Sequence, residues 1–562
     1  MAIVRDPLLV ELSLSVGQST IDGLAVDLRG PVPVGAVGLR RIPVAATAWL
    51  AAGVRSRRDA SRDDEPELGE LVGERSVLAF IRGEPSCRPS IHLVHSSFPA
   101  SHFESPRVVI LSVIVEHLDP GLSNFRDGLH SCLSPWGDAL FELCDAMCCA
   151  TGSIGSVPAL SMEPVFRRSH GSLYKALALG WIDEDALRSL VLEHRAGEWP
   201  LVFAVDSSTF DRRDAATSPD RGFYYSPSKQ TNGQRVIAGW SYQWISQLDF
   251  AMDSWTQPLD VVRLVVHEDE SARTIDQVTR LVSELPADRE VPLFVFDAGY
   301  NSIALGHGLK DVRCDVLVRI SSKRVFHFDP AMPPSGTVGR PRRHGLRFSL
   351  SDRKTWPEPH DTLTAEDLRY GTVTVEAWHD LHPRISGRVK GRWGELDQMP
   401  IVRGSVLRVE VERLPKPSGR TKKTLWLWWS GPCTPDLSRC WQSYLRRFDI
   451  EHTFRFMKGT LAWTMPAVRN PEQADRWTWL VLAAYTQLRL SRELVADLRL
   501  PWERRRELSQ LTPARVRRGF RQLRATIGTP AHAPKSITPG PGRPKGTRRP
   551  PRTRYPVIRR AA

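Results

Sequence analysis

The sequence has no acidic residue after Glu507, and this absence locates the charge of the chain. The 562 residues carry a formal net charge of +14, and fourteen of the 77 Lys and Arg residues lie between Arg515 and Arg560. Residues 1–507 are therefore formally neutral, with the remaining basic residues matching the 63 Asp and Glu. A histone-like polycation is excluded. A neutral body with a basic C-terminal arm favours a polyanionic partner such as DNA or RNA.

Long apolar runs, paired cysteine motifs and a leader-like start are also missing. The longest apolar runs, such as Val108–Val115 and Trp477–Tyr485, are too short to cross a bilayer, so no membrane partner is expected. The eight Cys residues include no CxxC pair, which argues against a cysteine zinc site and favours reduced thiols in a cytoplasmic protein. The first residues lack the basic-then-apolar layout of a signal peptide, so none is expected.

The length predicts several domains, and the first two differ in pattern. Residues 1–120 mix short apolar runs with Pro, Gly and charged clusters, so we expect a poorly ordered or accessory extension. Residues 121–198 are predicted to form a helical N-terminal domain and a candidate DNA-binding element. Apolar residues recur there at helical spacing in 124–150, 172–179 and 183–194, and Asp183 is placed as an N-cap.

Residues 199–320 alternate strand and helix patterns. Leu201–Val205 and Val291–Phe296 are apolar runs that end in Asp206 and Asp297 respectively. Ser271 is placed to cap a helix, and further strands are predicted at 235–245, 250–255, 261–266 and 314–320. This order predicts an α/β fold whose core is a mixed sheet flanked by helices.

Residues 321–440 are predicted to be a β-rich insertion. Strand patterns at 371–378, 405–412 and 424–429 alternate with Pro-, Gly- and Arg-rich loops, including the basic loop Gly339–Gly345. The Trp-rich strand Leu425–Trp429 is interpreted as core, with base stacking as the alternative. Helix returns over 441–458 and from 473 to about 498, within a core segment that spans 441–500.

The predicted helix over 441–458 carries four functional side chains on one face. At about 100° per residue they share a stripe about 60° wide: Tyr444, Arg447, Glu451 and Lys458. A surface salt-bridge ladder is one interpretation of this stripe. A site for metal and phosphate is the other. His452 falls off the stripe and is expected to pack or face solvent.

The two strand-end aspartates also allow two interpretations. An Asp after a strand is often only a turn or helix-cap residue. The carboxyl ends of strands are, however, where ligand and catalytic groups collect in open α/β sheets.

The spacing Tyr444-x2-Arg447-x3-Glu451-x6-Lys458 resembles the YREK signature of a group of DDE transposases from bacterial insertion sequences. Asp206 in FAVDSS and Asp297 in FVFDAGY resemble the first two acids of that family's triad. The resemblance spans about residues 122–530. It implies an RNase-H-like core and, as in some members, a β-rich insertion between the second Asp and the Glu.

The resemblance also implies a chemistry. The protein would cleave transposon-end DNA and join it to target DNA by Mg²⁺-dependent phosphoryl transfer. Asp206, Asp297 and Glu451 would be the catalytic residues and the ligands of two Mg²⁺ (or Mn²⁺) ions, with Asp206 bridging them. The residues expected to hold phosphates near the scissile bond are Tyr444, Arg447 and Lys458.

The expected partner is double-stranded DNA, both transposon ends and target, with a homodimer in the synaptic complex and association with the nucleoid. Two other functions fit the same fold. One is a catalytically silent, transposase-derived DNA-binding protein. The other is a different RNase-H-like, Mg²⁺-dependent nuclease, which would have no need of the YREK spacing.

Residues 501–562 are predicted to be a basic helix followed by a disordered DNA-binding tail. Thr512-Pro513 open the helix, whose apolar face can dock on the body. Its other face is expected to present four guanidinium groups to DNA: Arg517, Arg518, Arg521 and Arg524. Residues 539–560 are expected to lack fixed structure, and Arg543 lies in a Gly-Arg-Pro core that resembles an AT-hook. Removing Gln510–Ala562 is therefore expected to lower DNA affinity and flatten its salt dependence.

Overall fold

The computed structural model divides the chain into two units, Met1–Leu118 and Asp119–Ala562. The residues that the structure describes are the backbone of five strands before residue 96, and residues 120–225, 235–251, 253, 255–287, 289–332, 334–335, 338–385, 399–414, 423–535, 544–548 and 551–559.

The first unit contains a five-stranded sheet where the sequence pattern predicted no regular element. The sheet order is β3-β2-β1-β5-β4, and the strands are β1 (Val10–Val16), β2 (Ser19–Val26), β3 (Val54–Ser56), β4 (Val77–Arg82) and β5 (Ser90–His95). β1 pairs with β5 in parallel, whereas the other pairs are antiparallel. Pro- and Gly-rich stretches between these strands interrupt the apolar pattern, which hides the strands in the sequence.

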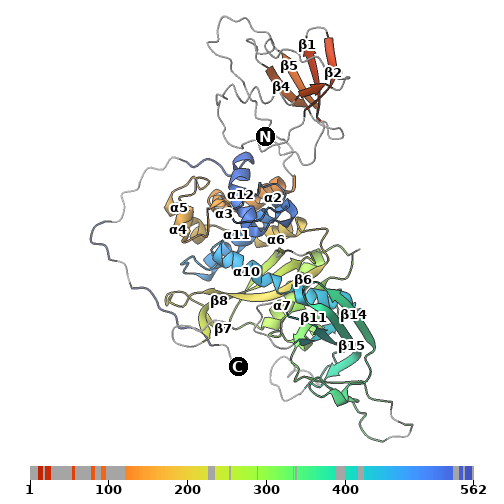
Figure 1. The fold of residues 1–562 in the computed structure, drawn as a ribbon. Helices are drawn as coiled ribbons and strands as arrows, with labels where there is room; N and C mark the ends of the chain where they lie inside the picture. Colours follow the sequence, from red (N-terminus) through yellow and green to blue (C-terminus); the bar gives the residue numbers. More distant parts are fainter. Residues whose placement is uncertain are drawn as a thin grey trace, which may run out of the picture. The chain divides into compact units, whose positions relative to one another are not determined.

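The second unit is built on a twelve-stranded mixed sheet (Figure 1). Its core strands are β6 (Val202–Asp211), β8 (Val236–Leu248), β9 (Thr256–Leu264), β10 (Leu293–Phe296) and β11 (Asp315–Ile320). β6, β10 and β11 run parallel, while β8 lies antiparallel to β6 and pairs with β9 and with the short β7 (Gly222–Tyr225). This mixed sheet, flanked by helices, confirms the predicted α/β, RNase-H-like core.

Two local predictions in this core are wrong. None of the described residues within 250–255 lies in a strand, and Asp253 accepts a hydrogen bond from the Trp255 amide (2.9 Å) in the loop before β9. The helix α7 (Glu270–Glu284) is capped by Asp269, not by Ser271. The Asp269 carboxylate accepts from the amides of Ser271 and Ala272, as the N-cap position requires.

The β-rich segment after β11 continues the same sheet. Its strands are β12 (Val325–His327), β13 (Arg347–Ser349), β14 (Asp361–Asp367), β15 (Gly371–Pro383), β16 (Gly404–Val411) and β17 (Thr424–Ser430). β17 pairs with β11, so one hydrogen-bonded ladder links the insertion to the core. Trp426 and Trp428 join Phe326 and Trp378 in a buried cluster, which confirms the interpretation of the Trp-rich strand as core.

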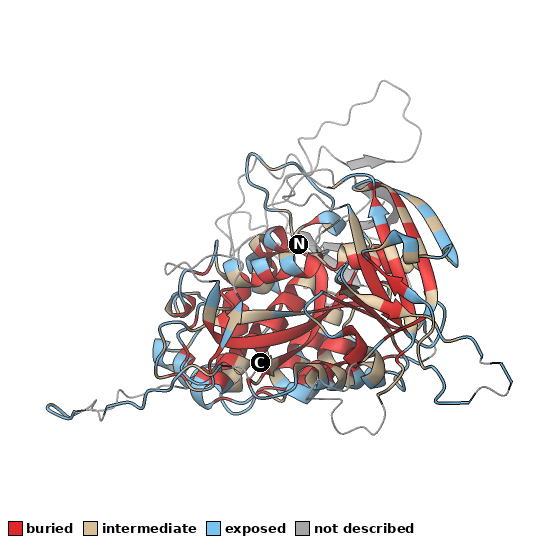
Figure 2. Cartoon of the chain, turned by 90° about the horizontal axis from the view of Figure 1, so that it is seen from below, coloured by how far each residue is buried: buried red, intermediate tan, exposed pale blue. Residues whose placement is uncertain are grey.

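Helices cover the sheet and form a layer of their own. They are α2 (Pro120–Ser131), α3 (Gly137–Cys149), α4 (Val157–Leu160), α5 (His170–Leu179), α6 (Glu184–Glu193), α8 (Ser302–Gly308), α9 (Leu437–Arg446), α10 (Asp449–Gly459), α11 (Pro471–Leu490) and α12 (Pro513–Thr526). α3 and α11 are buried along most of their length and pack against each other. Figure 2 shows buried residues throughout the sheet and the helices beside it. Among the described helices, none combines the length and apolarity that crossing a bilayer requires.

The helix predicted over 124–150 is two helices. Pro135 lies between α2 and α3, and proline restricts the backbone of the residue before it and has no amide hydrogen to donate. Asp183 caps α6 as predicted, because its carboxylate accepts from the amide of Ala186 (3.0 Å).

Candidate active site

The parallel pairing of β6 with β10 brings two aspartates together. The register pairs Val205 with Phe296, so the residues that follow, Asp206 and Asp297, are neighbours. The sequence pattern predicted Asp206 at the end of its strand. β6 continues to Asp211, however, so Asp206 lies inside the strand. Asp297 directly follows β10. The two carboxylates therefore meet where β10 ends and β6 continues.

The guanidinium group of Arg447 joins both carboxylates. Arg447 Nη1 lies 2.9 Å from Asp206 Oδ2, and Nη2 lies 4.0 Å from Asp297 Oδ2. Burial disfavours the charge of Arg447, but the carboxylates outweigh it and raise the pKa of Arg447. Arg447 thus neutralises part of the charge that the two strands concentrate.

The segment that carries the YREK-like residues is two helices instead of the single helix predicted over 441–458. α9 ends at Arg446 and α10 begins at Asp449. At the junction the Glu451 amide donates to the Phe448 carbonyl (3.0 Å), an i+3 bond that tightens the chain. Asp449, in the first turn of α10, favours a new helix start there.

Tyr444 on α9 and Arg319 on β11 both approach Asp297. The Tyr444 hydroxyl donates to Asp297 Oδ1 (3.5 Å), and Arg319 Nη1 lies 4.0 Å from the same oxygen. β10 and β11 pair Phe296 with Val318, so Arg319 is the next neighbour of Asp297 across the sheet. Arg319 is not among the site residues predicted from the sequence. Its only signal there is a charged residue inside the apolar run of β11.

Glu451 and Lys458 lie on α10. Glu451 is exposed, and its charge raises the pKa of Asp206. Burial lowers the pKa of Lys458, against the opposing charges of Asp211, Glu451 and Asp206. Lys458 Nζ also lies 5.4 Å from the centre of the Trp463 ring. The third acid and the second cation of the motif therefore act electrostatically on the same aspartate.

Asp206 is the most perturbed member of the group. Burial raises its pKa to about 6, and the charges of Glu451 and Asp297 act in the same direction. The Arg447 guanidinium and the Ser207 amide, which donates to Asp206 Oδ1 (2.8 Å), oppose the shift without cancelling it. Burial, more than the neighbouring acids, is therefore what disfavours the charged form of Asp206.

The donor types of the three acids suit a hard divalent cation. Asp206, Asp297 and Glu451 offer only carboxylate oxygens, the donor type that Mg²⁺ and Mn²⁺ prefer. A bound cation would favour the charged form of Asp206, which burial disfavours. His452 is not needed as a ligand, and its ring packs edge-on against Phe448, with 5.5 Å between ring centroids.

The prediction that α12 presents four arginines to solvent is wrong. Arg517 is 4% exposed and donates to the carbonyls of Met147 and Gly152 at the end of α3. Arg524 Nε lies 2.6 Å from Asp145 Oδ2, whose side chain is fully buried. A buried acid and the carbonyl end of a helix attract guanidinium groups inward.

The other two arginines of α12 lie nearer the surface. Arg518 Nη2 lies 2.6 Å from Glu503 Oε2, and Arg521 is 46% exposed and lies 3.6 Å from Glu163. The predicted DNA-facing surface is therefore reduced to Arg521 and, in part, Arg518.

The tail is tied to the body at its end. The Tyr555 amide donates to the Ala216 carbonyl and the Ile558 amide to the Arg221 carbonyl, both at 2.8 Å. Residues 539–560 were expected to lack fixed structure, and the hydrogen bonds of Tyr555 and Ile558 contradict this for the end of that segment. An isolated bridge pairs Ile558 with Gly222 at the start of β7. Arg543 lies outside the described residues.

Comparison with known proteins bears on this geometry. Residues 128–384 match the model of a family described as DDE superfamily endonuclease. The match contains Asp206 and Asp297 and ends before the YREK-like segment, so it does not reach the feature that defines the finer group. No curated protein matches the chain. The match makes this part of the chain similar to DDE endonucleases.

Proposed function

We propose that the protein is a transposase that cleaves transposon-end DNA and joins it to target DNA by Mg²⁺-dependent phosphoryl transfer. The observation that carries this proposal is the meeting of Asp206 and Asp297 around Arg447, with Glu451 acting on the same centre. The similarity to DDE endonucleases supports the reaction class.

Asp206, Asp297 and Glu451 would hold two Mg²⁺ or Mn²⁺ ions. When bound, such ions neutralise charge on the attacking and leaving oxygens of an in-line displacement. The chain's own cations complement them. Arg447 has a planar fork that suits two oxygens of one phosphate, whereas Lys458 supplies a point charge. Tyr444 holds Asp297 through its hydroxyl, which fixes the orientation of that carboxylate.

The proposed function includes partners that follow from the reaction. Pairing two DNA ends calls for at least two copies of the chain, so a homodimer in the synaptic complex stays a prediction. Nucleoid association is predicted for the same reason. Arg521, Arg518 and the tail with Arg543 are proposed to contact the DNA backbone outside the active site.

The decisive variant is Glu451→Gln, which removes one carboxylate charge at an exposed position. We expect Mg²⁺-dependent cleavage to fall about 1000-fold or more, since metal-based charge stabilisation supplies several kcal/mol. DNA affinity should stay near the wild-type value. The matched control is Asp276→Asn, an exposed acid on α7, which should leave both readouts unchanged. Undiminished cleavage by Glu451→Gln would reject the assignment.

The same assay separates the alternatives. The substrate is a supercoiled plasmid that carries the DNA flanking the gene, with a second plasmid as target. Cleavage followed by joining supports a transposase. Cleavage without joining indicates a different nuclease, and binding without cleavage indicates a silent DNA-binding protein.

A further inference from the structure

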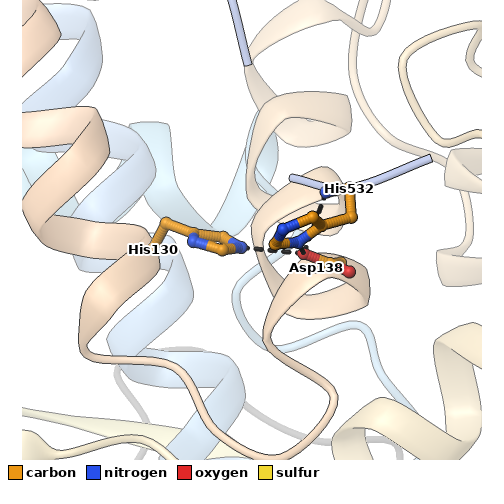
Figure 3. A group of neighbouring side chains, drawn as sticks. All are labelled: His130, Asp138 and His532. Atoms are coloured by element: carbon orange, nitrogen blue, oxygen red, sulfur yellow. Dashed lines mark hydrogen bonds and ion pairs between the residues drawn. The ribbon is translucent and has the colours of Figure 1, made fainter. Parts of the chain in front are cut away.

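A second group of side chains that could ligate a metal ion joins α2, α3 and the chain after α12 (Figure 3). His130 is in the last turn of α2, Asp138 is in the first turn of α3, and His532 follows α12. His130 Nε2 lies 2.8 Å from Asp138 Oδ1, and His532 Nδ1 lies 3.3 Å from the same oxygen. One candidate ligand atom from each residue lies within 4.8 Å of the other two.

The donor set differs in kind from that of the active site. Two imidazole nitrogens and one carboxylate oxygen suit borderline transition metals such as Zn²⁺, whereas Mg²⁺ prefers oxygen alone. Ligand atoms at about 2.0–2.1 Å from a tetrahedral ion lie roughly 3.3 Å from one another. The two separations from Asp138 Oδ1, 2.8 and 3.3 Å, are close to this value, and the two imidazole nitrogens, which lie within 4.8 Å of each other, would move closer around an ion.

Neighbouring groups hold the three ligands in place. The His130 ring packs edge-on against Phe141, with 5.6 Å between centroids. Arg168 Nη2 lies 3.1 Å from Asp138 Oδ2, the oxygen that faces away from the imidazoles, and donates to the His532 carbonyl (2.6 Å). The His532 amide also donates to Asp138 Oδ1 (3.1 Å). Such supporting contacts orient metal ligands.

We propose that His130, Asp138 and His532 bind one divalent transition-metal ion of the Zn²⁺ class, which fastens the chain after α12 to the α2–α3 pair. Water completes the coordination. Because His532 comes from beyond α12, the ion closes a link between the helical domain and the start of the basic tail. This role is independent of catalysis and of the proposed function.

The test is a calorimetric Zn²⁺ titration of the full chain in a constant excess of Mg²⁺, so that the oxygen site is occupied by its preferred ion. Wild-type protein is expected to bind one Zn²⁺ at this site. His130→Ala and His532→Ala should each lower the affinity more than about 100-fold, beyond the usual effect of a supporting residue. The control is His170→Ala, an exposed histidine on α5 outside the group, which should bind as wild type.

His532→Ala keeps the test valid because that side chain is 83% exposed and its loss does not disturb the core. A second readout is the Tm, which Zn²⁺ should raise in wild type and in His170→Ala but not in His532→Ala. Co²⁺ in place of Zn²⁺ should give the visible bands of a tetrahedral site. Zn²⁺ affinity unchanged in both ligand variants would overturn the proposal. So would an absence of binding in wild type, which would leave a hydrogen-bonded contact only.

Discussion

The buried charge of Asp206 should lower the free energy of unfolding in a pH-dependent way. Its pKa of about 6 lies above its ordinary value of 3.8. Between these values a rising pH removes the proton from the unfolded chain first. The folded state therefore loses stability from about pH 4 to pH 6, and the loss persists above pH 6.

Replacing Asp206 with Asn should relieve that cost. In the presence of a chelator, Asp206→Asn should be more stable than wild type by about 2–3 kcal/mol at pH 8, with no difference near pH 4. Denaturant unfolding of both proteins across this pH range measures the gap. Asp276→Asn is the control and should show no such gap. A gap that stays constant with pH would contradict the raised pKa.

Local sequence pattern is enough to predict three residues of the candidate site. Asp206 and Asp297 each follow an apolar run, and the YREK-like spacing marks Glu451. Arg319 escaped because a charged residue in a strand has no meaning until the sheet order places β11 beside β10. Sheet order depends on long-range pairing, which local sequence does not encode.

At the scale of elements, α12 divides its arginines between packing and surface. Arg517→Ala should destabilise the protein by about 2–4 kcal/mol, because it removes a buried guanidinium and leaves the buried Met147 carbonyl in the last turn of α3 without that donor. Arg521→Ala should change stability by less than about 0.5 kcal/mol and weaken DNA binding. Equal effects of the two variants on unfolding would contradict this division.

Helical periodicity identifies the apolar face of α12 but cannot assign neighbours to its polar face. Buried Asp145 on α3 also holds Arg126 of α2 (2.6 Å), so Arg524 joins a network that periodicity cannot show. The same limit applies to 441–458, where a single helical period runs across the junction between α9 and α10. Periodicity predicts which face of a helix each side chain occupies, but it does not predict where the helix ends.

At the scale of the whole molecule, the basic end of the chain has two parts. α12 packs on the core, whereas the tail after Pro534 is proposed to bind DNA. Leu511, Val516 and Phe520 are fully buried, so removing 510–562 would uncover the core as well as lower DNA affinity. The cut that tests the tail alone is after Pro534, which retains α12 and His532.

Removing 535–562 deletes nine Lys and Arg residues and no acid. The Tm should change little, while the salt dependence of DNA affinity should flatten by about 0.9 in logarithmic slope for each DNA phosphate that the tail no longer neutralises. Affinity measured against salt concentration, with the unfolding transition as control, checks this. An unchanged slope would mean that the tail does not contact DNA.

The pairing of β17 with β11 has a mechanical consequence. Arg319 beside Asp297 is itself paired with Leu427 of the insertion, so the insertion cannot swing away without breaking the ladder next to the candidate active site. Core and insertion thus present a surface of fixed shape. Under the proposed function, DNA lying across both must do the bending. Deforming a site of 20–30 base pairs costs about 1–6 kcal/mol and varies with sequence, so a stiff protein would select flexible targets without touching their bases.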